Sequence, residues 1–273
     1  MFFSRKTALL GAVFCLFGAG CATSDHFGGS RQRVVDWSGE RGFSASTARF
    51  GAFDLLVLER TTGRSDSLTI YIEGDGAAWL TPYRPPRDPT PVRPTALALS
   101  AVDPGSAVVY LGRPCQYLDQ HALADCSPLW WTTQRFAPEV LTAYDLALDH
   151  LKARAGARTL RLIGHSGGGV IATLLALRRQ DVSSLITVAS PLAIGDWARV
   201  KGISPLDGSL DPLLEAGNLP SATHWLGSND EIVPVAVVEL FVRVKGGRVI
   251  LVEGYDHACC WARDWPKFLK ESP

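Results

Sequence analysis

Short apolar runs alternate with helix-like stretches from residue 55 onward, and this alternation is the feature that most limits how the chain can fold. Several of the runs are rich in β-branched residues and show no polar alternation, which is typical of strands covered on both faces. Such an order predicts an α/β fold with a mostly parallel central sheet and helices on both faces. The expected strands are residues 55–58, 68–72, 107–111, 160–163, 185–189, 223–226 and 249–252.

The expected helices lie between these strands. In the clearest case, residues 138–154, Pro138 fits the first turn, Gly156 fits the end, and apolar residues recur at helical spacing. Residues 168–180, 235–245 and 261–270 are expected to form three more.

Two proline-containing stretches interrupt this pattern. In residues 77–104, the part from 82 to 94 cannot form an ordinary strand or helix. Residues 190–220 are longer than a normal connection, and we expect a lid or a wall of the substrate pocket there. The alternative for 190–220 is a helix with loops that only cover the core.

A glycine-rich pentapeptide, Gly164-His165-Ser166-Gly167-Gly168, joins an expected strand to an expected helix. This Gly-x-Ser-x-Gly pattern, in that context, places Ser166 on a sharp turn that exposes its hydroxyl. The glycines are needed because a β-carbon would collide with the turn. A purely structural glycine-rich turn is the alternative, so the interpretation depends on whether partners for Ser166 exist.

A serine hydroxyl needs an adjacent base, and the base needs an acid to orient it. Asp230 lies just after the expected strand 223–226, and His257 lies just after 249–252. The ends of parallel strands meet at one edge of a sheet, so Ser166, Asp230 and His257 are expected to assemble there as a catalytic triad.

These motifs resemble those of the α/β-hydrolases, over residues 55–269. The resemblance rests on the serine turn, the loop Gly-Ser-x-Asp-x-x-Val-Pro from Gly227 to Pro234, and the late His257. It implies the α/β-hydrolase fold and a covalent acyl-enzyme mechanism. It does not specify the substrate, because one scaffold serves esterases, lipases, peptidases and acyltransferases.

Other residues are candidates for the acid and the base. Asp196 is the alternative acid, and Glu231 is expected to point elsewhere. His165 is next to Ser166, but we expect it to be directed away from the pocket. Asp256 is expected to shape the loop of His257 rather than orient its ring. The remaining histidines fall in a tether, a loop, a helix and a strand: His26, His121, His150 and His224.

The oxyanion hole requires two backbone donors. The N–H of Gly167 is expected to be one, and the amide of Asp75 or Gly76, after the strand 68–72, to be the other. This segment resembles the oxyanion segment of the family, with Glu73 where histidine is common. A simple Gly-Asp-Gly turn is the alternative. The carboxylate of Asp75 would oppose an oxyanion unless it points away or is paired. Arg113 is expected to form an ion pair that holds its loop, and contact with an anionic group of the substrate is the alternative.

The N-terminal residues are typical of an export signal, with Arg5 and Lys6, an apolar stretch, and small residues before Cys21. The pattern resembles a bacterial lipoprotein signal in which Cys21 is acylated, although Gly18 stands where leucine is usual. Ordinary secretion is the alternative. We expect residues 1–20 to be the signal, 21–50 a tether (flexible over 24–33) and lead-in segment, and 51–273 the hydrolase domain. The expected location is the periplasmic side of the cell envelope.

The cysteines fit export. Cys115 and Cys126 enclose a loop rich in turn-forming residues and are expected to form a disulfide. For Cys259 and Cys260, a vicinal disulfide and a cysteine that pairs elsewhere or stays free both remain open. The cysteine and histidine spacing supports no zinc site, and a catalytic cysteine is disfavoured.

Composition limits the other function classes. Without Arg5 and Lys6 of the signal, 25 basic and 27 acidic side chains remain, with no basic stripe, so no nucleic-acid partner is expected. No metal or organic cofactor is expected either. The chain is predicted to be a serine hydrolase acting on a small-molecule ester-like acyl substrate. The alternatives are a non-catalytic envelope lipoprotein that binds a ligand and an acyltransferase. Nothing in the sequence predicts an oligomeric state.

Overall fold

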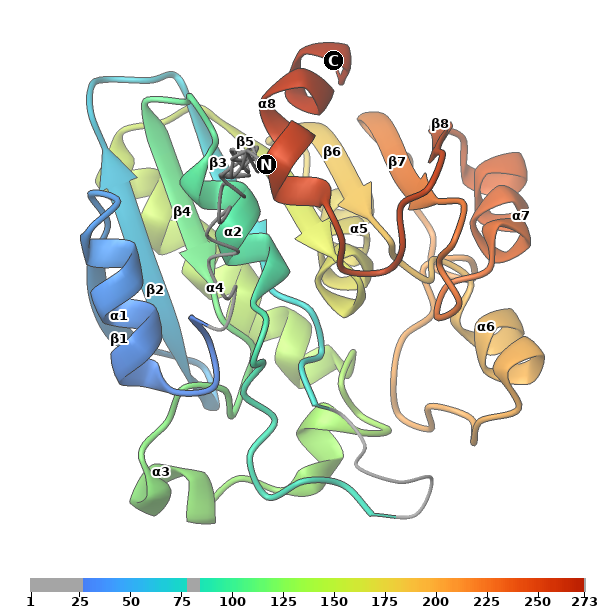
Figure 1. The fold of residues 1–273 in the computed structure, drawn as a ribbon, viewed down its shortest axis with the longest axis horizontal. Helices are drawn as coiled ribbons and strands as arrows, with labels where there is room; N and C mark the ends of the chain where they lie inside the picture. Colours follow the sequence, from blue (N-terminus) through green and yellow to red (C-terminus); the bar gives the residue numbers. More distant parts are fainter. Residues whose placement is uncertain (1–26, 78–83, 273) are drawn as a thin grey trace, which may run out of the picture.

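An eight-stranded sheet runs through the computed structural model, which describes residues 27–77 and 84–272 (Figure 1). The spatial order is β1-β2-β4-β3-β5-β6-β7-β8. Strands β3 to β8 are parallel to one another, whereas β2 is antiparallel to both of its neighbours. The strands are β1 (Ser44–Phe50), β2 (Phe53–Thr61), β3 (Ser67–Ile72), β4 (Ala107–Leu111), β5 (Thr159–His165), β6 (Val182–Val188), β7 (Ser221–Gly227) and β8 (Arg248–Val252).

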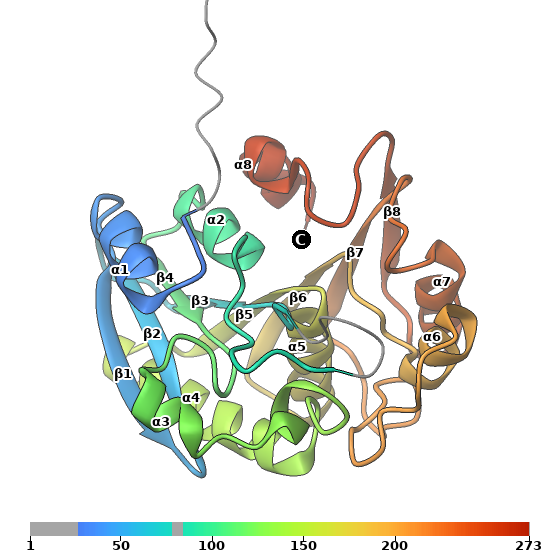
Figure 2. The ribbon, with the colours of Figure 1, turned by 60° about the horizontal axis from the view of Figure 1, so that its bottom comes forward.

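Helices cover both faces of the sheet. Figure 2 shows α1, α2 and α8 on one face and α4 and α5 on the other. Alternate residues of β2 serve the two cores: Leu55 and Val57 pack with α4 and α5, while Leu56 and Leu58 pack with α1, α2 and α8. The helices are α1 (Arg31–Gly39), α2 (Thr95–Ala101), α3 (Gln120–Ala124), the 3₁₀ helix η1 (Pro128–Trp131), α4 (Pro138–Ala155), α5 (Gly167–Arg178), α6 (Ile194–Lys201), α7 (Val235–Lys245) and α8 (Trp261–Glu271).

The main prediction from the sequence is confirmed. All seven expected strands are present, and β4 has the bounds that its apolar run predicts. Every side chain of β4 is buried, because both faces of the sheet are covered. Helix α4 begins at Pro138 and ends at Ala155, and it is followed by Gly156, which adopts the left-handed conformation that suits a glycine.

The N-terminal segment differs from the expectation. Residues 28–33 of the expected flexible tether are folded: Gly29 donates a backbone hydrogen bond to Pro91 (2.8 Å), and Ser30 caps α1. Strand β1 then pairs with β2 along its whole length. The β1 residues are mostly small and exposed, so they show no apolar run that would have predicted a strand. The expected signal and Cys21 lie outside the described residues.

The two interrupting stretches also contain helices. Residues 85–94 are neither helix nor strand, as predicted, but α2 begins directly after Pro94. Residues 190–220 contain α6 and turns.

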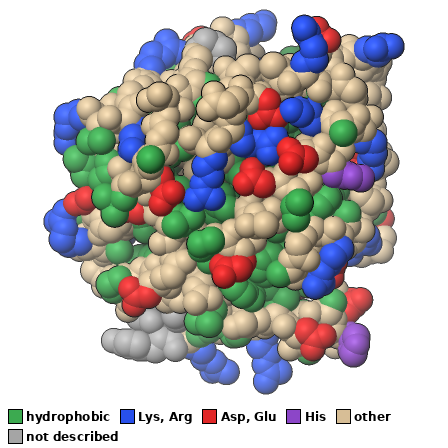
Figure 3. Space-filling model, turned by 180° about the vertical axis from the view of Figure 1, so that it is seen from behind, with side chains coloured by type: hydrophobic (Ala, Val, Ile, Leu, Met, Phe, Trp, Pro, Cys, Tyr) green, Lys and Arg blue, Asp and Glu red, His purple; other side chains and the backbone are tan. Residues whose placement is uncertain are grey.

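On the side of the molecule viewed in Figure 3, acidic and basic side chains are interspersed, and no large patch carries charge of one sign only. Within residues 27–77 and 84–272, none of the helices combines the length and the apolar character needed to cross a bilayer.

Candidate active site

The serine turn sits between β5 and α5. Ser166 has φ 52° and ψ −125°, a left-handed conformation that is costly for a residue with a side chain and that is held by the packing around it. The turn tolerates no added β-carbon at its glycines. A β-carbon on Gly164 would stand 2.3 Å from the Gly168 oxygen, and one on Gly168 would stand 2.1 Å from the Ile72 oxygen. The glycine requirement inferred from the sequence therefore has a steric cause.

The structure brings the three expected side chains together. The Oγ of Ser166 lies 3.0 Å from Nε2 of His257. On the other side of the ring, His257 Nδ1 lies 2.9 Å from Oδ2 and 3.2 Å from Oδ1 of Asp230. Both links are of hydrogen-bond length, so the ring can accept a proton from the hydroxyl while the carboxylate orients it.

The carboxyl group of Asp230 is held in an ionised state. Asp230 Oδ1 accepts backbone hydrogen bonds from Ile232 (2.8 Å) and Val233 (2.9 Å), and its carboxylate is shielded from solvent. Burial by itself would raise the pKa of Asp230. The hydrogen bond and charge of His257 outweigh it, together with the two N–H groups, and the pKa stays below its ordinary value.

The loops that carry Asp230 and His257 are tied to each other. Asn229 donates a backbone hydrogen bond to the Tyr255 oxygen (2.8 Å), and Ser228 donates one to the Val252 oxygen (3.0 Å). A β-carbon on Gly227 would stand only 2.2 Å from the Tyr255 oxygen, so the two loops approach at a glycine. This contact fixes the distance between Asp230 and His257.

His165 does not point away from the site, so that expectation is wrong. Its Nε2 lies 2.8 Å from the backbone oxygen of His257, and the two rings are 5.1 Å apart. Burial, and then the proximity of His257, lower the pKa of His165 to about 3. The neutral ring donates its Nε2 proton to that carbonyl and so supports the loop of His257. The sequence shows only that His165 adjoins Ser166; the fold brings it to His257.

The loop after β3 lies beside the serine turn. A β-carbon on Gly74 would be 3.4 Å from Cβ of Ser166. Gln116 Nε2 donates to the Gly74 oxygen (3.1 Å). Because carbonyl and N–H point in opposite directions in a trans peptide, Gln116 also fixes the direction of the Asp75 N–H. Gly76 instead packs under residues 89–91, since its β-carbon would stand 2.1 Å from the Pro89 oxygen. The geometry therefore favours Asp75 over Gly76 as the second donor.

The carboxylate of Asp75 is paired, which removes the objection to an acid at this position. Arg113 Nη1 lies 2.8 Å from Oδ1, and Arg135 Nη1 lies 2.7 Å from Oδ2. Burial would raise the pKa of Asp75, but the two guanidinium groups hold it below its ordinary value. The expected ion pair of Arg113 is thus present. Arg135 was not predicted, because only the fold brings residues 60 positions apart into contact.

Glu73 anchors the loop after β3 through hydrogen bonds of its side chain. Its carboxyl group is buried and accepts hydrogen bonds from the backbone of Gly74 (2.8 Å), Ala96 (3.3 Å) and Leu97 (3.3 Å). Burial raises the pKa of Glu73 to about 7, although these N–H groups lower it in part. The residue therefore ties the loop to the start of α2.

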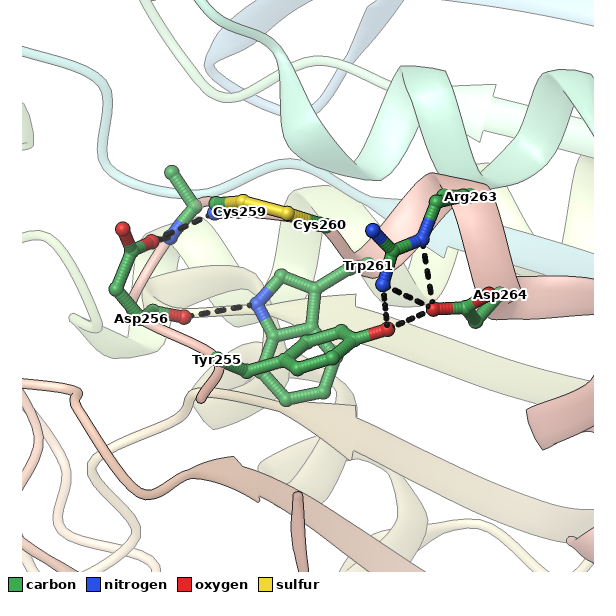
Figure 4. The surroundings of a disulfide bond; sticks show 8 residues. Tyr255, Asp256, Cys259, Cys260, Trp261, Arg263 and Asp264 are labelled. Carbon is green, nitrogen blue, oxygen red and sulfur yellow. Dashed lines mark hydrogen bonds and ion pairs between the residues drawn. A yellow bond between two sulfur atoms is a disulfide. The ribbon is translucent and has the colours of Figure 1, made fainter. Parts of the chain in front are cut away.

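Two disulfides flank these loops. The predicted Cys115–Cys126 bond is confirmed, and it closes the segment that follows Arg113. Cys259 and Cys260 form a vicinal disulfide just after His257 (Figure 4). Asp256 shapes this loop as expected, because its Oδ1 accepts hydrogen bonds from the backbone of Ala258 (2.8 Å) and Cys259 (2.6 Å).

Asp196, Glu231 and His224 take no part in the hydrogen bonds that link Ser166, His257 and Asp230, and His26 lies outside the described residues. Asp196 forms an ion pair with Arg199 on α6, and Glu231 is exposed. His224 is buried and hydrogen-bonded to Thr187 (2.8 Å). The 190–220 segment reaches the loop of Asp230 through Trp197, whose Nε1 donates to the Ile232 oxygen (2.8 Å). In the described part of the chain, no three His, Cys, Asp or Glu side chains are grouped as metal ligands.

Comparisons with known proteins support the fold. No family model and no curated protein sequence matches the chain. Among solved structures, Est1E from Butyrivibrio proteoclasticus aligns at 17% identity over 83% of this chain and 98% of its own, with a TM-score of 0.56. The Pyrococcus furiosus esterase Pf2001 aligns at 12% identity over 85% and 90%, with a TM-score of 0.57. The chain adopts the α/β-hydrolase fold.

A third similar structure has a different printed activity. The proline iminopeptidase of Mycobacterium smegmatis shares this fold at 13% identity, over 84% of this chain and 98% of its own, with a TM-score of 0.57. Esterases and a peptidase are therefore similar to the chain to the same degree. The likeness therefore establishes the α/β-hydrolase fold, whereas the chemistry depends on the residues of the site.

Proposed function

We propose that this protein is a serine hydrolase that cleaves an ester-like acyl bond in a small-molecule substrate. The observation that carries the proposal is the continuous chain of hydrogen-bond distances from Ser166 Oγ through His257 to Asp230. Esterases are among the structures with the same fold, which is consistent with this chemistry.

In the proposed first half-reaction, Ser166 Oγ attacks the acyl carbon while its proton passes to His257 Nε2. Asp230 keeps the proton of Nδ1 in place and stabilises the charged ring. The oxyanion that forms is held by the backbone N–H groups of Gly167 and Asp75. When the tetrahedral intermediate collapses, the bond to the leaving group breaks, and the leaving group takes the proton from Nε2.

In the proposed second half-reaction, water attacks the acyl-serine and gives a proton to His257 Nε2. Collapse of the second intermediate releases the acid and returns the proton to Ser166. The cycle uses no metal and no organic cofactor.

Activity on nitrophenyl esters of graded chain length, together with labelling by a fluorophosphonate, tests the proposal. The wild-type protein is expected to turn over the esters and to be labelled, and Ser166→Ala is expected to lose both. Ser44→Ala, an exposed serine on β1, is the matched control and should keep both. Folded wild-type protein that is neither labelled nor active would point to a binding role instead. Product formed only when an alcohol or amine is added would indicate acyl transfer.

We also propose export to the periplasmic side of the cell envelope, with a lipid anchor on Cys21. Two disulfides are consistent with an oxidising compartment. Incorporation of labelled palmitate, lost in Cys21→Ala, is the measurement expected to support the anchor. Equal labelling of both proteins would contradict it.

A further inference from the structure

A groove of about 1130 Å³ lies between α2 and the segment that follows His257. One side consists of Pro94 and the α2 residues Thr95, Ala98 and Ala101, and the other runs from Ala258 to Arg263. Figure 4 shows the second side, with the Cys259–Cys260 disulfide, Trp261 and Arg263 next to one another. Pockets for small molecules measure about 300–1,000 Å³, so this groove has room for a longer ligand.

The lining of the groove combines apolar side chains with cations. Phe27 and Trp37 stack on each other with ring centroids 3.9 Å apart, and α2 contributes only small side chains. Three arginines line the groove, Arg41, Arg93 and Arg263, and none of the described lining residues is acidic. A ligand that matches this lining has an apolar body and a negative charge.

The three arginines are not equally available. Arg263 is paired with Asp264 (2.7 Å), and Arg41 lies over the Trp37 ring, 3.5 Å from Glu40. Arg93 is exposed and has no hydrogen-bond or ion-pair partner among the described residues. Arg93 is therefore the side chain that can bind an anionic group without first breaking an existing pair.

From these observations we propose that the groove binds an anionic phospholipid, with an acyl chain along the apolar walls and the phosphate at Arg93. The position of the first described residue, Phe27, is consistent with a lipid as the ligand. Phe27 lines the groove, and Cys21 is six residues earlier, so the two are separated by no more than about 20 Å of extended chain. A lipid anchor at Cys21 would hold the groove close to the lipid headgroups.

The groove is distinct from the serine site, although the two are neighbours. Ala258 is in its wall, and His257 precedes it in the chain. The proposal does not depend on hydrolysis, and it can be tested in a protein that lacks the Ser166 hydroxyl.

The test uses the full chain carrying Cys21→Ala and Ser166→Ala, which removes the acylation site and prevents turnover. Its probe is dioctanoyl-phosphatidylglycerol below its micelle concentration, with binding measured by calorimetry. A chain-brominated form of the same lipid should quench tryptophan fluorescence, because Trp37 and Trp261 line the groove. We expect saturable binding, at least about tenfold weaker binding of the matching phosphatidylcholine, and no binding of glycerol phosphate alone.

Two variants separate charge from volume. Arg93→Glu is expected to weaken phosphatidylglycerol binding by about tenfold or more, and Ala98→Trp is expected to abolish it by filling the groove. Arg64→Glu, the same charge change at an exposed arginine that does not line the groove, should change nothing. Melting temperatures of all variants verify that they are folded.

The proposal is overturned if Arg93→Glu and Ala98→Trp bind the lipid as well as their parent does. Equal affinity for phosphatidylglycerol and phosphatidylcholine would also overturn it, because the anionic group would then not be recognised. A complete lack of lipid binding would also overturn the proposal. The residues before Phe27 would then be the alternative occupant of the groove.

Discussion

The carboxylate of Asp75 lies against the α-carbon of Gly167, so closely that a β-carbon on Gly167 would stand 2.0 Å from Asp75 Oδ1. The two residues that we propose as oxyanion donors are therefore in direct contact. Arg113 and Arg135 hold the Asp75 carboxylate in that position. The contact makes the spacing of the two donors a consequence of packing.

Gly167→Ala should displace the Asp75 loop, because the ion pairs leave the carboxylate little room to retreat. Loss of one oxyanion donor costs about 10²–10³ in kcat in enzymes known to use such a site, and we expect a loss of that order. Steady-state ester hydrolysis measures it. Gly39→Ala is the control, since a β-carbon there meets no atom within 4 Å, and it should leave kcat unchanged. Wild-type kcat in Gly167→Ala would contradict the proposed role of this contact.

Gln116→Ala should lower kcat by about 10-fold to 10³-fold with little change in KM, because the Asp75 N–H loses its fixed direction. Affinity for a boronic acid, which imitates the tetrahedral intermediate, should fall in parallel with kcat/KM. If Gln116 had only a structural role, Gln116→Ala would lower the melting temperature, and the affinity for the boronic acid would not fall in parallel with kcat/KM.

Asp230→Asn should reduce kcat by about 10⁴, the order seen when the acid of such a triad becomes an amide. The amide would donate to Nδ1 of His257, so the proton would move to Nε2, and the ring could no longer accept the proton of Ser166. Asp256→Asn, one residue before His257, is the matched control, because an amide oxygen can still cap the loop. Similar losses in both variants would argue against a specific role for Asp230.

His165→Leu should lower kcat by roughly 10-fold to 100-fold, because the His257 carbonyl loses its donor and the loop that carries His257 is less fixed. His224→Leu removes another buried, hydrogen-bonded histidine, and we expect it to affect stability but not kcat. The pH profile should not change in His165→Leu, since burial keeps the pKa of His165 at about 3 and the ring neutral at assay pH.

Glu73 should make the protein less stable as the pH rises. The pKa of this carboxyl group is about 4.3 in an unfolded chain and about 7 in the fold, so the native state binds more protons between these values. The free energy of unfolding should fall across that range, by a few kcal/mol at most. Melting temperatures from pH 5 to pH 8 measure the slope, which Glu73→Gln should remove. An unchanged slope in that variant would assign the pH dependence to another group.

The parallel strands were predictable because their apolar runs carry the signal locally, as in β4. Strand β1 was not predictable, because its exposed residues show no apolar pattern. Helix α2 was not predicted either, because it directly follows a proline-rich stretch. For the site, the order of Ser166, Asp230 and His257 was enough to expect them at one edge of the sheet. The contacts made by Arg135, Gln116 and His165 depend on segments far apart in the chain, and no local pattern predicts them.

Strand β8 is the outermost strand of the parallel side, and none of its residues is fully buried. His257, the base of the proposed triad, lies in the loop that follows this strand, whereas Ser166 follows a strand in the middle of the sheet. Fraying of the edge would thus carry His257 away while the cores on both faces remain intact. Activity should therefore be lost at a lower temperature than the melting temperature, and the inactivated protein should still show its native circular dichroism spectrum.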